Sequence, residues 1–63
     1  MDNFIRQMVI NWFEKNHNTH KVLREMGDDP IEEAVKIFDI TYNQAQACER
    51  AYVRKSRGTR PYA

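Results

Sequence analysis

Two signals for the start of a helix lie twelve residues apart, at Asp29 and Thr41, and they constrain the fold of this 63-residue chain most strongly. The first is Asp29 followed by Pro30, an N-cap residue before a residue that suits the first helical turn. The second is Thr41, another N-cap residue. Each cap is followed three residues later by Glu or Gln, as a capping box requires. The sequence therefore predicts helices over 30–38 and 42–55.

The segment between these two helices has the features of a tight turn. Asp39 tolerates a left-handed backbone better than most residues, and Ile40 is expected to insert into the core. In the second helix, a stripe of small or apolar residues is predicted to face inward: Ala45, Cys48 and Tyr52, flanked by Ala47 and Ala51. Two helices, a short turn and a small-residue stripe predict a helix-turn-helix unit.

Two further helices are predicted in the first half of the chain, over 3–16 and 19–26. Asp2 can cap the first helix, Asn18 or Thr19 can cap the second, and Gly27 is a natural end for the second. The first helix carries apolar residues at the spacing of one buried face: Phe4, Ile5, Met8, Val9, Trp12 and Phe13. No segment alternates as a strand does. We expect an all-α bundle of four helices.

The length predicts one helical domain over 1–58 with a flexible tail over 59–63. So small a domain has no room for a deep catalytic cleft, and we expect no enzyme. The single cysteine, Cys48, excludes an internal disulfide and favours a reducing, cytoplasmic compartment. No segment reads as a membrane span or a signal peptide.

No cofactor or metal is expected. His17 and His20 are three residues apart and, with Cys48, would supply only three zinc ligands. We expect both histidines to be exposed near a helix start.

The net charge of +1 conceals an uneven distribution. Residues 1–21 sum to +1, residues 22–42 to −4 and residues 43–63 to +4. The acids of the middle third suit the positive end of a helix dipole, and an acidic partner surface is the alternative. The last third has five cations and one acid, Glu49, and is therefore suited to meet an anion.

The outward face of helix 42–55 carries side chains that can contact DNA. Asn and Gln can pair with adenine and Arg with guanine in the major groove, where recognition helices present their first turns. The base-edge candidates are Tyr42, Asn43, Gln44, Gln46 and Arg50. The phosphate-contact candidates are Arg54, Lys55, Arg57 and Arg60. Glu49 is expected to accept from a cytosine amine or to orient Arg50 or Arg54. The alternative is a solvated face whose basic end suits the helix dipole.

Residues 30–58, PIEEAVKIFDITYNQAQACERAYVRKSRG, resemble the helix-turn-helix of bacterial sigma-factor region 4 and related response-regulator-type domains. The shared features are an acid-rich first helix, a short turn ending in Ile-Thr, and a second helix with a Glu and a basic end. In that family the second helix reads promoter DNA in the major groove, so the resemblance places the five base-edge candidates at the DNA. Asp39 stands where the family usually has Gly, and Ala45 replaces a larger aliphatic residue.

The sequence thus predicts a small transcriptional regulator that binds double-stranded DNA. Because one module with few cations binds weakly, we expect a homodimer, with Phe4, Met8 and Trp12 as the dimer contact. Phage and plasmid regulators are of similar size. The alternative is a protein-interaction module, such as a phage-type inhibitor or adaptor of a host protein, with no DNA binding. The acidic middle and the aromatic first helix would then form the partner surface.

Overall fold

The computed structural model describes the backbone of residues 2–59 and the side chains of residues 2–55. Within this part the chain forms four helices and no strand, so the predicted all-α bundle is confirmed. The helices are α1 (Asn3–Lys15), α2 (His17–Glu25), α3 (Pro30–Phe38) and α4 (Tyr42–Thr59).

Helix α2 begins earlier than predicted because α1 and α2 share a junction residue, Asn16. The Asn16 N–H donates to the Trp12 carbonyl at 3.0 Å, and its own carbonyl accepts from the His20 N–H at 2.9 Å. The Asn16 side chain also donates to the Trp12 carbonyl, at 2.9 Å, and makes no cap for α2. The predicted caps, Asn18 and Thr19, lie inside the helix instead.

Helix α4 is longer than predicted, because it continues past Lys55 to Thr59. Ser56 and Gly58 each destabilise a helix by no more than about 1 kcal/mol relative to alanine, which is too little to end a long helix. The first residue that forbids a helix is Pro61, which also restricts the residue before it. Thr59 therefore belongs to the helix, and the rest of the predicted tail, 60–63, lies outside the described residues.

The predicted caps of α1, α3 and α4 are formed. The Asp2 carboxylate accepts from the Phe4 N–H at 2.8 Å. At the start of α4, the Thr41 hydroxyl accepts from the Gln44 N–H at 3.1 Å, and the Gln44 side chain accepts from the Thr41 N–H at 3.0 Å. These two reciprocal bonds complete the predicted capping box and define where α4 begins.

The box predicted for α3 is only half formed. One Asp29 oxygen accepts from the Ile31 N–H at 3.0 Å, so Asp29 is the N-cap. The other oxygen accepts from the Tyr42 hydroxyl of α4 at 2.6 Å. Among the described residues, the Glu32 side chain returns no hydrogen bond to the Asp29 backbone. The Asp29 cap therefore also ties the start of α3 to the start of α4.

The turn between α3 and α4 has the predicted conformation. Asp39 ends α3 with φ 55° and ψ 50°, the left-handed region that Asp reaches at low cost. Ile40 is half-buried and packs against the core, as expected of an apolar turn residue. Three residues, 39–41, thus join α3 to α4.

Three helices supply the fully buried core. Its members are Val9, Ile10 and Phe13 from α1, Ile31 and Ala34 from α3, and Ala45 and Cys48 from α4. Half-buried Trp12, Ala51 and Tyr52 pack against it. Of the predicted inner stripe of α4, Ala45 and Cys48 are buried and Ala51 and Tyr52 are half-buried, whereas Ala47 is exposed.

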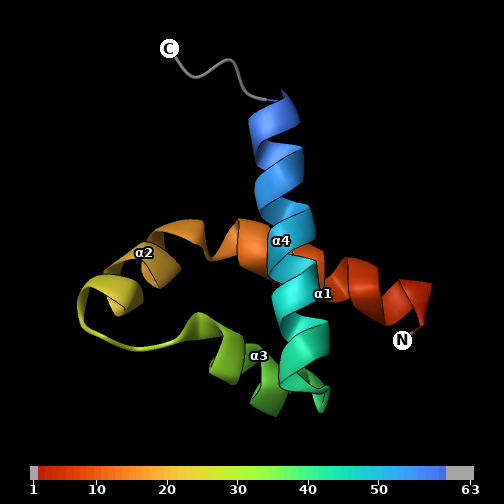
Figure 1. Ribbon diagram of the computed structural model, residues 1–63, viewed down its shortest axis with the longest axis horizontal. Helices are drawn as coiled ribbons and strands as arrows, with labels where there is room; N and C mark the ends of the chain where they lie inside the picture. Colours follow the sequence, from red (N-terminus) through yellow and green to blue (C-terminus); the bar gives the residue numbers. More distant parts are fainter. Residues whose placement is uncertain (1, 60–63) are drawn as a thin grey trace.

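The predicted buried face of α1 is wrong in its first two turns. Phe4 is 71% exposed and Met8 44% exposed, and Ile5 is also exposed. Ile10, which is not part of the predicted face, is buried. Figure 1 gives the reason: α4 crosses α1 away from its N-terminus, and the first turns of α1 extend beyond the crossing.

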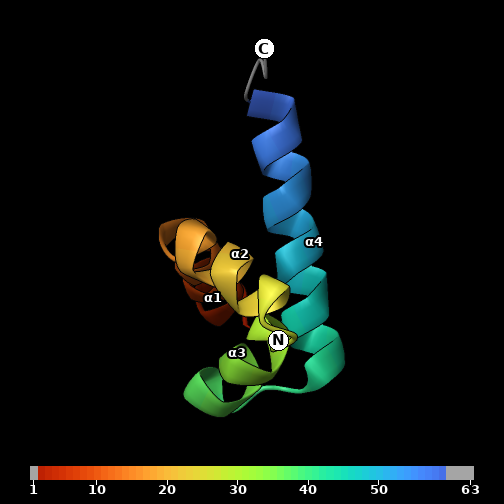
Figure 2. The same cartoon turned by 90° about the vertical axis from the view of Figure 1, so that its left-hand side faces the viewer.

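Helix α4 forms one side of the molecule. Figure 2 shows that α1, α2 and α3 lie together on one side of α4. In both views the C-terminal part of α4 extends past the other three helices (Figures 1 and 2). One face of α4 is therefore left uncovered by the described residues.

Candidate nucleic-acid interface

The uncovered face of α4 carries Asn43, Ala47, Arg50 and Arg54, and all four are exposed. Their spacing of three or four residues places them in one row along the helix. We call this row the open face of α4. It offers one amide and two guanidinium groups, which can donate to base edges or phosphates.

Glu49, the one acid of the last third, is engaged in an ion pair within the fold. Glu49 binds Arg24 of α2, and the Glu49 side chain is only 21% exposed. The expectation that Glu49 orients Arg50 or Arg54 is not met, because its carboxylate is engaged across the α2–α4 contact. The acid next to the open face is therefore paired within the fold.

The structure separates the five predicted base-edge residues into two groups. Asn43 and Arg50 lie on the open face. The polar ends of Tyr42 and Gln44 are used within the fold, in the Asp29 bond and the capping box, and Gln46 is half-buried. The hydrogen bond to Asp29 raises the pKa of Tyr42, so its hydroxyl stays protonated.

Of the predicted phosphate-contact residues, Arg54 lies on the open face. Together with Glu49, Arg50 and Val53 it lines a shallow hollow of about 320 Å³. The Lys55 ammonium lies 3.7 Å from the Glu14 carboxylate of α1. Arg57 belongs to α4 but its side chain is not described, and Arg60 lies outside the described residues.

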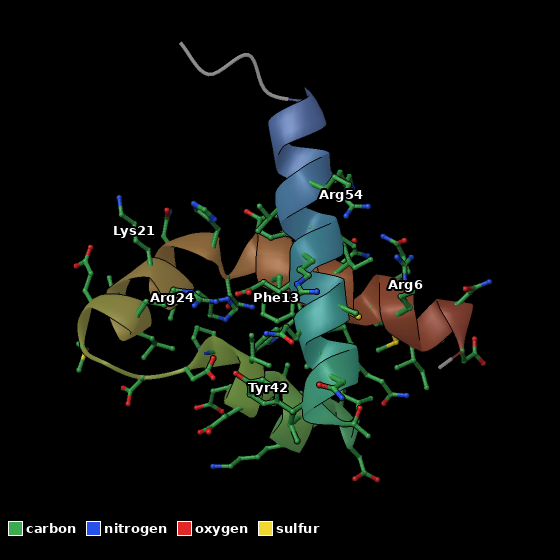
Figure 3. The ribbon with its side chains drawn as sticks, in the orientation of Figure 1. Arg6, Phe13, Lys21, Arg24, Tyr42 and Arg54 are labelled. Atoms are coloured by element: carbon green, nitrogen blue, oxygen red, sulfur yellow. The ribbon has the colours of Figure 1, made fainter. Side chains whose placement is uncertain are left out.

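One further cation, Arg6, was missed by sequence reasoning. Arg6 is exposed on α1, and Figure 3 shows its side chain on the same side of α4 as Arg54. Its position depends on how α1 crosses α4, and no local signal in the sequence could have indicated it.

The acids of the middle third gather at the start of α3. They surround a hollow of about 200 Å³ with Leu23 and Lys36, and they are Asp28, Asp29, Glu32 and Glu33. This side of the molecule would repel phosphates, so it limits the orientations in which α4 could approach DNA.

One of the two histidines, His20, differs from expectation. His20 is 7% exposed, with its ring centroid 4.5 Å from that of Trp12 and 5.5 Å from that of Phe13. His17 is exposed as predicted, and its Nδ1 lies 2.7 Å from the Tyr52 hydroxyl of α4. Within residues 2–55, no group of three metal-binding side chains comes together. Burial raises the pKa of the Cys48 thiol, which therefore is not activated.

The burial of His20 predicts a pH-dependent stability. Burial lowers the pKa of His20, with smaller contributions from Arg24 and His17 and an opposing one from Glu33. The unfolded chain therefore takes up this proton at a higher pH than the folded chain. The contribution of His20 to stability is present above a pH of about 6.5 and is lost as the pH falls through the folded-state pKa.

We expect the free energy of unfolding, measured with urea, to fall between about pH 7 and pH 5. The fall should be smaller in His20→Phe, because phenylalanine keeps the ring packing but cannot titrate. The carboxylates are common to both proteins, so the difference between the two slopes isolates His20. Equal slopes would contradict the prediction.

Comparison with known proteins gives no match: no family model, no curated protein and no solved structure is detectably similar to this chain. Among the described residues, no helix has both the length and the apolar character to cross a membrane.

Proposed function

We propose that this protein is a transcriptional regulator that binds double-stranded DNA, with α3 and α4 acting as a helix-turn-helix and α4 entering the major groove. The observation that carries the proposal is the open face of α4, where Asn43, Arg50 and Arg54 are exposed. Glu49 lines the same hollow as the two arginines, but its carboxylate is paired with Arg24 of α2. Isolated cations on a protein surface are common, but a row of donors on a projecting helix is the arrangement that groove readers use.

The geometry of the turn supports the same proposal. Asp39 replaces the Gly that related turns usually contain, yet it adopts the required left-handed conformation. Ala34 of α3 and Ala45 of α4 are both completely buried, and such small side chains allow two helices to approach closely. The two departures from the sigma-factor pattern are therefore compatible with helix-turn-helix packing.

In this proposal, Asn43 and Arg50 read base edges, and Arg54 positions the helix on a phosphate. Arg6 adds a second phosphate contact from α1. Lys55, Arg57 and Arg60 follow Arg54 in the sequence and are further candidates for phosphate contact. Tyr42, Gln44 and Gln46 sit at the start of α4 as supporting residues whose polar groups are mainly engaged or half-buried.

The proposal includes a homodimer in the cytoplasm. A single module with so few cations would bind with low specificity, and two copies would double the contacts. Phe4 and Met8 are exposed and available for such a contact, whereas Trp12 is half-buried and packs on His20 and Phe38. The dimer contact is therefore better assigned to Phe4, Ile5 and Met8.

The test is binding to a random-sequence duplex across a salt series, measured by fluorescence anisotropy. If about four cations contact phosphates, the logarithm of the association constant should fall with the logarithm of salt concentration with a slope of about −3 to −4. Absence of binding at low salt would contradict the proposal. That result would favour the second candidate, a protein-interaction module whose surface is the exposed apolar start of α1.

A further inference from the structure

A cavity of about 220 Å³ lies where α1, α2 and α4 meet, and the proposed DNA-binding face does not use its interior. Its apolar lining comes from Phe13, the Tyr52 ring and Val53. Sites for drug-sized ligands occupy roughly 300–1,000 Å³, so this cavity is large enough only for a smaller molecule, such as one with a single ring.

One wall of the cavity is a buried histidine without a hydrogen-bond partner. His20 lines the cavity and is 7% exposed, and among the described residues neither of its ring nitrogens has a hydrogen-bond partner. The described residues also contain no side-chain nitrogen or oxygen that is both unpartnered and sealed from solvent. The His20 nitrogens therefore keep some access, and the cavity that His20 lines provides it. A buried polar group in this state is stabilised by any ligand that pairs with it.

The charge of the cavity favours an anion. Arg24 lines it and reaches from α2 toward Phe13 and α4, as Figure 3 shows. Its ion pair with Glu49 engages only part of a guanidinium that has five N–H donors, and the Arg24 side chain remains 48% exposed. Lys21 also lines the cavity, with its side chain directed outward in Figure 3. The residues that line the cavity thus include two cations and one acid.

We propose that this cavity binds a small aromatic carboxylate. The ring lies against Phe13 and Tyr52, and the carboxylate accepts hydrogen bonds from His20 and Arg24. A neutral imidazole carries one N–H, so His20 can donate to the carboxylate without being charged. Residues of α1, α2 and α4 meet in this site, and the ligand would therefore bind all three helices.

The test uses benzoate as the probe, titrated into the ¹⁵N- and ¹³C-labelled full chain without DNA, and followed by NMR. We expect saturable shifts at His20, Arg24 and Val53. Benzamide, which keeps the ring without the charge, and acetate, which keeps the charge without the ring, should each bind about tenfold more weakly or not at all. Absence of saturable shifts with benzoate up to its solubility, or equal shifts with acetate, would overturn the proposal.

Two variants and one matched control test the assigned contacts. His20→Phe keeps the ring packing and removes both nitrogens, and Arg24→Gln removes the guanidinium. Each should weaken benzoate binding by about tenfold, the effect of one hydrogen bond to a charged group. Arg6→Gln makes the same charge change outside the cavity and should leave binding within about twofold.

If both site variants bind benzoate as the unmodified protein does, the assignment is wrong. If His20→Phe changes the overall spectrum, Arg24→Gln, whose side chain is half exposed, decides the question against Arg6→Gln. Because the measurement contains no DNA, its outcome is independent of the proposed function.

Discussion

Replacing Phe13 with alanine is expected to lower the free energy of unfolding by about 3–5 kcal/mol. Phe13 is 1% exposed, and its ring makes edge-on contacts with Trp12 at 5.0 Å and with His20 at 5.5 Å between centroids. The substitution removes an aromatic ring from the point where α1 meets α2 and α4. Domains of this kind have a total stability of about 5–15 kcal/mol, so the loss would leave the chain marginally folded or unfolded.

The measurement is urea denaturation monitored by far-ultraviolet circular dichroism. Phe4→Ala is the matched control, because it removes the same ring from an exposed position on the same helix. We expect it to change the stability of the monomer by less than about 0.5 kcal/mol. Similar losses in both variants would contradict the core described here. A loss in Phe4→Ala that grows with protein concentration would instead support the proposed dimer contact.

The double variant Arg50→Ala with Arg54→Ala is expected to weaken DNA binding by roughly 30-fold or more. Loss of a base-reading arginine such as Arg50 costs about 1–3 kcal/mol, and about 1.4 kcal/mol corresponds to a factor of ten. Loss of Arg54 removes a phosphate contact in addition. Both residues are exposed, so the fold should persist. The measurement is the same anisotropy titration at low salt, with circular dichroism to verify the helix content.

The control for this variant is Lys21→Ala with Lys36→Ala. It changes the net charge by the same amount, but its residues lie on α2 and α3. If α4 is the contact, the lysine variant should bind DNA within about threefold of the unmodified protein. Equal losses in the two variants would show that total charge, and not the open face of α4, governs binding. No effect of the arginine variant would contradict the proposed function.

Features that depend on a few neighbouring residues were predicted well. Asp2, Asp29 and Thr41 cap the helices that follow them, and Asp39 takes the left-handed conformation. The bounds of α3 and the start of α4 follow from these residues because capping bonds join groups two or three positions apart. Periodicity also identified the inner stripe of α4, since Ala45 and Cys48 are buried.

Features that depend on packing were predicted less well. The apolar start of α1 looked like core, but the crossing of α1 and α4 leaves Phe4 and Met8 exposed. His20 was expected at the surface, yet Trp12 and Phe13 bury it. Periodicity shows which residues share a helical face, but it does not show how much of that face another helix covers.

For the candidate site, the sequence by itself determined that Asn43, Arg50 and Arg54 share one side of a helix, and how that helix begins, because both are consequences of helical geometry and local hydrogen bonds. The tertiary structure alone decided which polar groups of that helix are available. Tyr42 is engaged by Asp29, and Glu49 by Arg24, across distances of 13 and 25 residues in the chain. Such partners meet only when separate helices pack, and that packing leaves the row from Asn43 to Arg54 open.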